Sequence, residues 1–98
     1  MRVPIAHNLP KEEVRRRLRE GVPDLSRYVP GGMADVTTEW RDEDHMALSV
    51  AAMGQAVRGE VIVEERQVVF VMEVPPMLSF LRPVIEEAVR DKGQKLLL

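Results

Sequence analysis

The chain contains no cysteine, and this absence excludes disulfide bonds, thiolate metal sites and cysteine nucleophiles. Aromatic residues are scarce, at 4% of the chain, so single-stranded bases would find few rings on which to stack. No apolar run approaches the roughly 20 residues that a membrane-spanning helix requires. The N-terminal residues have no long apolar centre and do not resemble a secretory signal. We therefore expect a cytoplasmic protein without a membrane span, stabilised by packing alone.

The remaining composition is that of an ordinary globular protein. Hydrophobic residues make up 45% and charged residues 31% of the 98 residues. A chain of this length buries about 60% of its unfolded surface, which is enough for one modest core. We therefore expect a single domain over residues 1–98. The formal net charge of −2 argues against specific nucleic-acid binding.

The N-terminal part predicts a short strand followed by a helix. Residues 2–6 place Val3 and Ile5 on one side, and Pro4 between them is best tolerated on an edge strand. In the helix, apolar residues recur at steps of three or four and form one stripe. These residues are Val14, Leu18, Val22, Leu25 and Val29. Pro23 is expected to bend or split the helix.

Residues 33–74 change to an apolar period of two, which predicts four strands in succession. The first strand covers residues 34–40, and residues 42–44 form the turn that follows it. In the second strand, residues 45–53, alternate residues give one apolar face. These residues are Met46, Leu48, Val50 and Ala52.

Gly54 and Gly59 interrupt the next run, and a test of strand registers assigns each a role. If Gly54 and Gln55 form a two-residue hairpin turn with glycine first, apolar residues pair on one face. The pairs are Ala52 with Val57, Val50 with Gly59, Leu48 with Val61 and Met46 with Val63. A second hairpin with Glu65 and Arg66 at its tip adds further pairs: Val63 with Val68, Val61 with Phe70, Gly59 with Met72 and Val57 with Val74. Gly59 then lies in a middle strand, where its missing side chain is expected to let a helix approach closely.

The C-terminal residues return to helical spacing, through Met77, Leu81, Val84 or Ile85, Ala88 and Val89. Pro76 suits the start of this helix, Pro83 is expected to kink or divide it, and Gly93 is expected to cap its end. Together the elements predict an α+β fold in the order β-α-β-β-β-β-α. We expect an antiparallel meander sheet of four to five strands, with two helices packed on one face.

Reactive side chains are few and form no recognised catalytic motif. His45 adjoins three carboxylates at residues 42–44, a group that in principle suits a hard cation. A solvated hairpin tip explains the group as well, because calcium loops need a longer ligand spacing. Gly54 and Gly59 match the outer glycines of a phosphate loop, but the lysine that such a loop requires is missing. We therefore expect no enzyme activity, no catalytic residues, no metal site and no cofactor.

Arginines concentrate on the exposed sides of the first predicted helix, and Arg15, Arg16 and Arg19 are the candidates for a basic contact. The cluster fits phosphate, an anionic surface or an acidic partner. It also fits a solvated helix in which arginines pair with neighbouring glutamates. Both interpretations stay open.

The second face of the predicted sheet should be polar, but the register gives it an apolar band. Its central row reads Glu39, Ala47, Ile62 and Val69, with Val71 alongside. Four of these residues are candidates for a partner surface and are called the sheet-face candidates below: Ala47, Ile62, Val69 and Val71. They fit a homodimer through face-to-face sheets or adhesion to a hydrophobic surface, although scattered apolar surface residues are also normal.

The sequence resembles one family, the polyhydroxyalkanoic acid system proteins encoded near polyester granule genes in bacteria. The resemblance rests on MRVPIAHNLPKEEVRRRL at the N-terminus, AMGQAVRGEVIVEE in the centre, VP ahead of the last helix and IEEAVRDKGQKLL near the end. The chain departs from the family pattern at Pro76 and Pro83, where a bulky aromatic residue and a small helix former are expected. The resemblance implies a granule-associated or regulatory role in polyhydroxyalkanoate storage. It implies no enzyme activity and supplies no catalytic residues.

Two functions of different classes follow. The favoured one is a non-catalytic structural or interaction protein, acting as a dimer, on a polyester granule surface or on a granule protein. The alternative is a small carrier that binds an acyl or hydroxyacyl chain between sheet and helices, where Gly59, Ala52 and Met72 leave a cavity. A chain of this length has little volume to spare, which disfavours the carrier.

Overall fold

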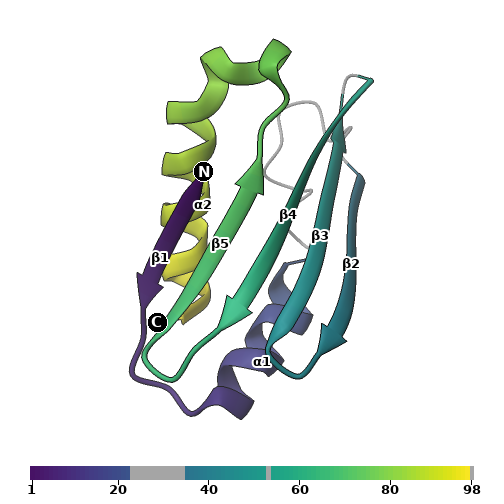
Figure 1. The fold of residues 1–98 in the computed structure, drawn as a ribbon. Helices are drawn as coiled ribbons and strands as arrows, with labels where there is room; N and C mark the ends of the chain where they lie inside the picture. The colour runs from purple at the N-terminus through teal and green to yellow at the C-terminus, as the bar shows by residue number, and fades with distance from the viewer. Residues whose placement is uncertain (23–34, 53, 98) are drawn as a thin grey trace.

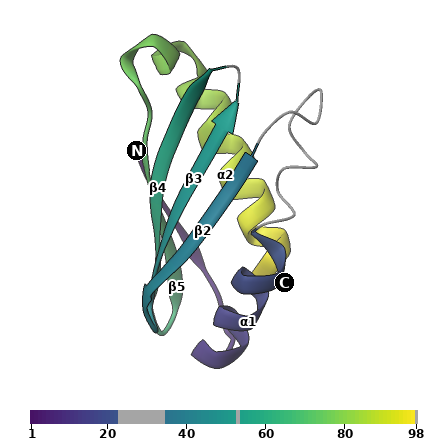
Figure 2. The same cartoon turned by 90° about the vertical axis from the view of Figure 1, so that its right-hand side faces the viewer.

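A computed structural model describes residues 1–22, 35–52 and 54–97. In this part of the chain, five strands form one antiparallel sheet, and two α-helices cover one of its faces (Figures 1 and 2). The elements are β1 (Arg2–Ala6), α1 (Lys11–Gly21), β2 (Asp35–Asp42), β3 (His45–Ala52), β4 (Gln55–Val63), β5 (Gln67–Glu73), the 3₁₀ helix η3 (Pro76–Leu81) and α2 (Arg82–Leu97). The strands lie in the spatial order β1-β5-β4-β3-β2. The predicted α+β fold and its element order are confirmed, in the five-stranded form.

β1 is an edge strand that accommodates Pro4 without losing a hydrogen bond to β5. The Met72 N–H donates to the Met1 carbonyl at 2.8 Å, and the His7 N–H donates to the Arg66 carbonyl at 2.9 Å. Because bonded and non-bonded residues alternate along an antiparallel pair, the Pro4 nitrogen points away from β5. The proline therefore lies at the outer edge of the sheet, as predicted.

Helix α1 buries the apolar stripe that its spacing predicted. Val14 and Leu18 are fully buried on the helix, and Val22 is buried just after its end. These side chains belong to the cluster between sheet and helices. Three other residues of this prediction lie outside the described residues: Pro23, Leu25 and Val29.

The β3–β4 hairpin differs from its predicted register by two residues. Ala52 pairs with Gln55 instead of Val57, and Gln55 is therefore in β4 instead of in the turn. Gly54 has a φ of 74°, a left-handed conformation that glycine adopts without a steric cost. The observed pairs are Met46 with Val61, Leu48 with Gly59 and Val50 with Val57. A shift of two keeps the predicted face of each strand, because side chains alternate with a period of two.

The β4–β5 hairpin has the predicted register. Val63 pairs with Val68, Val61 with Phe70 and Gly59 with Met72. The Glu64 N–H donates to the Gln67 carbonyl at 2.9 Å, which leaves Glu65 and Arg66 at the tip. The fourth predicted pair, Val57 with Val74, does not form because β5 ends at Glu73.

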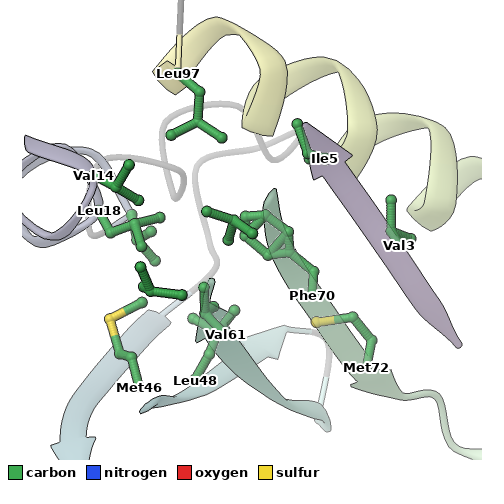
Figure 3. Close-up of a cluster of buried hydrophobic side chains, with 13 residues drawn as sticks. Val3, Ile5, Val14, Leu18, Met46, Leu48, Val61, Phe70, Met72 and Leu97 are labelled. Carbon is green, nitrogen blue, oxygen red and sulfur yellow. The ribbon is translucent and has the colours of Figure 1, made fainter. Parts of the chain in front are cut away.

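The buried apolar side chains between the sheet and the helices form one cluster (Figure 3). Its members are Val3, Ile5, Val14, Leu18, Val22, Met46, Leu48, Val61, Val63, Val68, Phe70, Met72 and Leu97. The faces assigned to β3, β4 and β5 from their alternation are thereby confirmed. Val69 is also fully buried, but it projects from the opposite face of β5 and is not a member of this cluster.

The close approach of a helix to the sheet occurs at a different glycine from the one predicted. A Cβ atom added to Gly59 would lie 2.5 Å from the Met72 sulfur and 2.8 Å from the Val71 carbonyl oxygen. The space beside Gly59 is therefore taken by β5 rather than by a helix. Gly93 is buried inside α2, where an added Cβ would collide with Ile5 Cδ1 and lie 3.2 Å from Phe70 Cε2. Gly93 thus seats α2 on β1 and β5, and the predicted helix cap at this residue is wrong.

Pro83 divides the C-terminal segment as predicted, because η3 ends at Leu81 and Pro83 lies in the first turn of α2. A proline is favourable in a first turn, where its missing N–H has no helical partner in any case. The predicted inward stripe is only partly correct. Ile85 and Val89 are half-buried, whereas Met77 and Val84 are exposed.

Candidate functional site

The sheet-face candidates do not form the continuous band that the sequence predicted. Ala47 faces Glu60 instead of Ile62 because of the shifted β3–β4 register. Ile62 is instead flanked by His45 and by Val69. Val69 is fully buried, and the other three candidates are half-buried. The face therefore has a small apolar centre interrupted by polar residues.

The most exposed large apolar side chains that the structure describes lie elsewhere, on η3 and the start of α2. Met77 is 74% exposed, Phe80 72% and Val84 63%. Met77 and Phe80, which are three residues apart, share one side of η3, and Val84 follows in the first turn of α2. These three residues are called the η3 stripe below. Figure 1 shows η3 at one end of the molecule, beyond the end of β5 and away from α1.

The η3 stripe was not identified from the sequence, because one apolar spacing was followed along the whole segment on both sides of Pro83. Phe80 was not part of the predicted apolar spacing, which included Met77 and either Val84 or Ile85. Pro83 is the available signal, since a proline that divides a segment means that the spacing of α2 does not continue into η3.

The arginines of α1 mainly pair with acidic groups of the same domain. Arg15 Nη2 lies 2.7 Å from Asp44 Oδ1, and Lys11 Nζ lies 3.1 Å from Asp44 Oδ2. These two cations hold the pKa of the Asp44 carboxyl below its usual value, through hydrogen bonds from Arg15 first and Lys11 second. Arg16 pairs with Glu13 and with Glu20. The ion pairs dock α1 on the turn between β2 and β3.

Glu13 is the carboxylate with the largest shift of pKa in this group. Arg16 and Arg17 both donate hydrogen bonds to it, and they lower the pKa of Glu13 to about 2. The guanidinium carbon of Arg19 lies 6.0 Å from the centroid of the Trp40 ring, at the outer limit for an attraction between a cation and an aromatic face. Among the described contacts of Arg15, Arg16 and Arg19, only that of Arg19 is with an aromatic ring.

A shallow hollow lies between α1 and the start of the sheet's β2–β3 turn. Its lining consists of Glu12, Arg15, Arg16, Arg19, Trp40, Asp42 and Glu43. The three arginines are balanced by three carboxylates, so the hollow does not have the excess of positive charge that attracts phosphate groups. This arrangement favours the solvated, internally paired helix.

His45 and Asp42 form an ion pair at the β2–β3 turn. His45 Nδ1 lies 2.8 Å from Asp42 Oδ1 and 2.9 Å from Oδ2. The hydrogen bond that the His45 ring donates to Asp42 raises the pKa of His45, and the same bond lowers the pKa of Asp42. Asp44 is occupied by Arg15 and Lys11. Among the described residues, no cluster of His, Asp and Glu side chains is arranged to hold a metal ion.

The His45–Asp42 pair predicts a stability that depends on pH. Because the pKa of His45 is raised in the folded state, its contribution is fully present below the ordinary value of 6.5 and is lost as the pH rises through the folded pKa. Glu60 and Asp44 add weaker attraction to the charged ring. We expect the difference in unfolding free energy between the wild type and His45→Gln, measured by urea denaturation, to be larger at about pH 5.5 than at about pH 8. A difference independent of pH would contradict the pairing.

His7 is a buried polar residue whose role is structural. The Leu9 N–H donates to His7 Nδ1 at 3.2 Å, so the hydrogen of the neutral ring lies on Nε2. Nε2 in turn donates to the Glu64 carbonyl at 3.0 Å. Both ring nitrogens are therefore used to join the end of β1 to the β4–β5 turn, and neither faces a cavity.

An apolar cavity of about 260 Å³ lies between α2 and the inner face of the sheet. Its described lining is Val22, Val36, Leu48, Val50, Val57, Phe70, Met72, Ile85, Ala88, Val89, Lys92, Gly93 and Leu96. The carrier alternative, which the sequence disfavoured, required a cavity between sheet and helices beside Met72, and Met72 does line this cavity. Gly59 is not in the lining, and the side chain of Ala52 lies outside the described part of the chain.

Comparison with known proteins gives one match. A family model described as "Putative polyhydroxyalkanoic acid system protein" matches residues 1–97. No curated protein matches the chain, and no solved structure matches it. Within the described residues, no helix is long and apolar enough to cross a membrane.

Proposed function

The chain belongs to the polyhydroxyalkanoic acid system protein family, as its sequence resemblance indicated, and from this premise we propose that it is a cytoplasmic, non-catalytic protein that adsorbs to the surface of polyester granules. The observation that carries the proposal is the η3 stripe. Its three side chains are at least 63% exposed and belong to η3 and the first turn of α2, at an end of the molecule.

The η3 stripe has the properties that adsorption to a hydrophobic surface requires. Complete burial of a Val, Met or Phe side chain contributes about 1.5–3 kcal/mol, so three neighbouring side chains supply enough for reversible attachment. Single exposed apolar residues are normal, but several of the largest ones close together in the sequence at one end of the molecule are a feature of contact surfaces. The stripe lies outside the core cluster, so attachment requires no unfolding.

The sheet-face candidates stay a prediction for a second contact, a homodimer through face-to-face sheets. Ile62 and Val71 are half-buried, and Glu60 lies between them on the same face. A carboxylate at the centre of a contact is costly to desolvate. We therefore assign the granule contact to the η3 stripe in preference to the sheet.

The proposal is tested by co-sedimentation with polyhydroxyalkanoate particles. We expect the double variant Phe80→Gln/Val84→Gln to lower the partition constant about tenfold or more, because about 1.4 kcal/mol of lost contact corresponds to a factor of ten. Both side chains are exposed, so the unfolding free energy should change by about 0.5 kcal/mol or less. An unchanged partition constant in a folded double variant would refute the stripe as the contact.

The control variant is Ile62→Gln, which makes a comparable polar change on the open face of the sheet. It should bind particles as the wild type does. If Ile62→Gln alone abolishes co-sedimentation, the sheet face is the granule contact. Light scattering on the same variant tests the homodimer, since a dimer through this face should dissociate.

A further inference from the structure

The cavity between α2 and the sheet is a second apolar feature, separate from the η3 stripe. One wall is a side of α2 that includes Ala88 and Val89, and the other wall consists of inner-face residues of β2, β3, β4 and β5. Neither Phe80 nor Val84 is in its lining.

The position of α2 explains why the cavity exists. Gly93 lets α2 pack closely on Ile5 of β1 and Phe70 of β5, so the helix lies against the β1 side of the sheet. The inner-face side chains of the strands farther from β1 are covered less completely. Val50 and Val57 are half-buried and pack against the core cluster.

An apolar space of this size is suited to a ligand. Protein interiors are normally packed as densely as organic crystals, and apolar cavities that stay empty of water bind apolar molecules. A cavity of roughly 150 Å³ accommodates the six carbons of benzene. By proportion, the 260 Å³ of this cavity accommodates an alkyl chain of about ten carbons.

Lys92 is the charged residue of the described lining, and its position would orient a bound acid. It is the one ionisable side chain in the described lining. Its side chain is 28% exposed, and its Nζ lies 3.8 Å from Asp91 Oδ2. Such a lysine covers apolar surface with its methylene groups while its ammonium reaches water. A ligand carboxylate at the mouth of the cavity would share this ammonium with Asp91.

We propose that the cavity binds the chain of a single alkanoic or hydroxyalkanoic acid of about ten carbons, with the carboxylate beside Lys92 and the alkyl chain between Val89 and the inner face of β3 and β4. The site is distinct from the granule contact and does not depend on it. It gives the protein a second activity, the binding of one free acid per chain.

Calorimetric titration with a series of alkanoic acids tests the proposal. We expect saturable binding of decanoic acid and 3-hydroxydecanoic acid at one molecule per chain. Each added methylene up to this length should tighten binding about fourfold, and hexadecanoic acid should gain nothing further because its chain exceeds the cavity. Binding that does not saturate, or that strengthens steadily with chain length to hexadecanoic acid, would overturn the proposal.

A pair of tryptophan variants on α2 locates the ligand. Ala88 is exposed to solvent and also lines the cavity. The larger side chain in Ala88→Trp should therefore fill the cavity without overpacking the core. Glu87 is its exposed neighbour outside the lining. We expect Ala88→Trp to raise the Kd for decanoic acid at least tenfold and Glu87→Trp to leave it unchanged, with both variants folded by circular dichroism. Equal affinities of Ala88→Trp and Glu87→Trp for decanoic acid would refute this location of the ligand.

The role of Lys92 is tested by comparing an acid with the matching alcohol. Lys92→Gln should weaken the binding of decanoic acid about fivefold and leave the binding of decanol unchanged, because only the acid carries the charge that the ammonium attracts. An equal effect on both ligands would refute the orientation. The variant Phe80→Gln/Val84→Gln should bind decanoic acid normally, and Ala88→Trp should bind polyester particles normally, so failure of this site and failure of the granule contact are distinguishable.

Discussion

Replacement of Phe70 by alanine is expected to lower the free energy of unfolding by about 3–5 kcal/mol, the usual loss for a buried phenylalanine. Phe70 is 5% exposed and belongs to the core cluster. It lies between Val3 and Val61 in the register of the sheet and contacts the site of Gly93 on α2. Because small domains are stable by only about 5–15 kcal/mol in total, a large fraction of the variant should unfold on mild heating.

Urea denaturation measures this loss, and Val71→Ala is its matched control. Val71 is the next residue on β5, but it is half-buried on the opposite face of the sheet. We expect Val71→Ala to cost about 1 kcal/mol or less. Equal losses for the two variants would mean that the faces of β5 have been assigned incorrectly.

Replacement of Gly93 by alanine is expected to destabilise the protein by about 2 kcal/mol, although alanine is the better helix former. The added methyl group collides with Ile5 Cδ1 and crowds the ring of Phe70. Overpacking of this kind costs up to about 3 kcal/mol, and the gain in helix propensity offsets about 1 kcal/mol of it. Gln94→Ala, at the exposed neighbouring position, should be neutral or slightly stabilising.

A second substitution removes the atom that causes this clash. Ile5→Val deletes Cδ1 and by itself should cost about 0.5–1.5 kcal/mol. Combined with Gly93→Ala, it should restore at least about 1 kcal/mol relative to the sum of the single losses. Denaturation of all four proteins in the cycle measures this coupling. Strictly additive losses would show that α2 does not contact β1 at Gly93.

The strands and their faces could be predicted from the sequence because alternation of apolar residues determines both. The strand registers could be predicted only in part. Matching apolar residues gave the correct pairs for β4 and β5, yet it placed β3 and β4 two residues out of register. A shift of two leaves the same faces together, so the apolar pattern does not distinguish the two arrangements. The positive φ of Gly54 does not distinguish them either, because the predicted loop also places glycine at a position of positive φ.

The candidate surfaces depend on how the elements pack against one another, and the spacing of apolar residues does not determine this packing. Which side of the last helix faces the sheet is determined by where Pro83 divides the segment and by the seat that Gly93 provides on β1. The sequence identified both residues but assigned Gly93 to a cap. The break in the predicted apolar band follows from the β3–β4 register, because it moves Glu60 opposite Ala47. The cavity was predicted in the correct layer, but its lining depends on the seat of α2.

The position of Pro4 on β1 also affects whether copies of the chain can assemble into fibrils through the edges of their sheets. An outermost strand with a regular series of outward N–H groups serves as a template on which further strands assemble. On β1 this series is interrupted at its middle residue, so templating from that side is blocked. The opposite border is β2, whose irregular pairing between Trp40 and Asp42 and exposed Asp35 and Glu39 disfavour the stacking of identical copies. Protein concentrated at a hydrophobic surface would gain most from this protection.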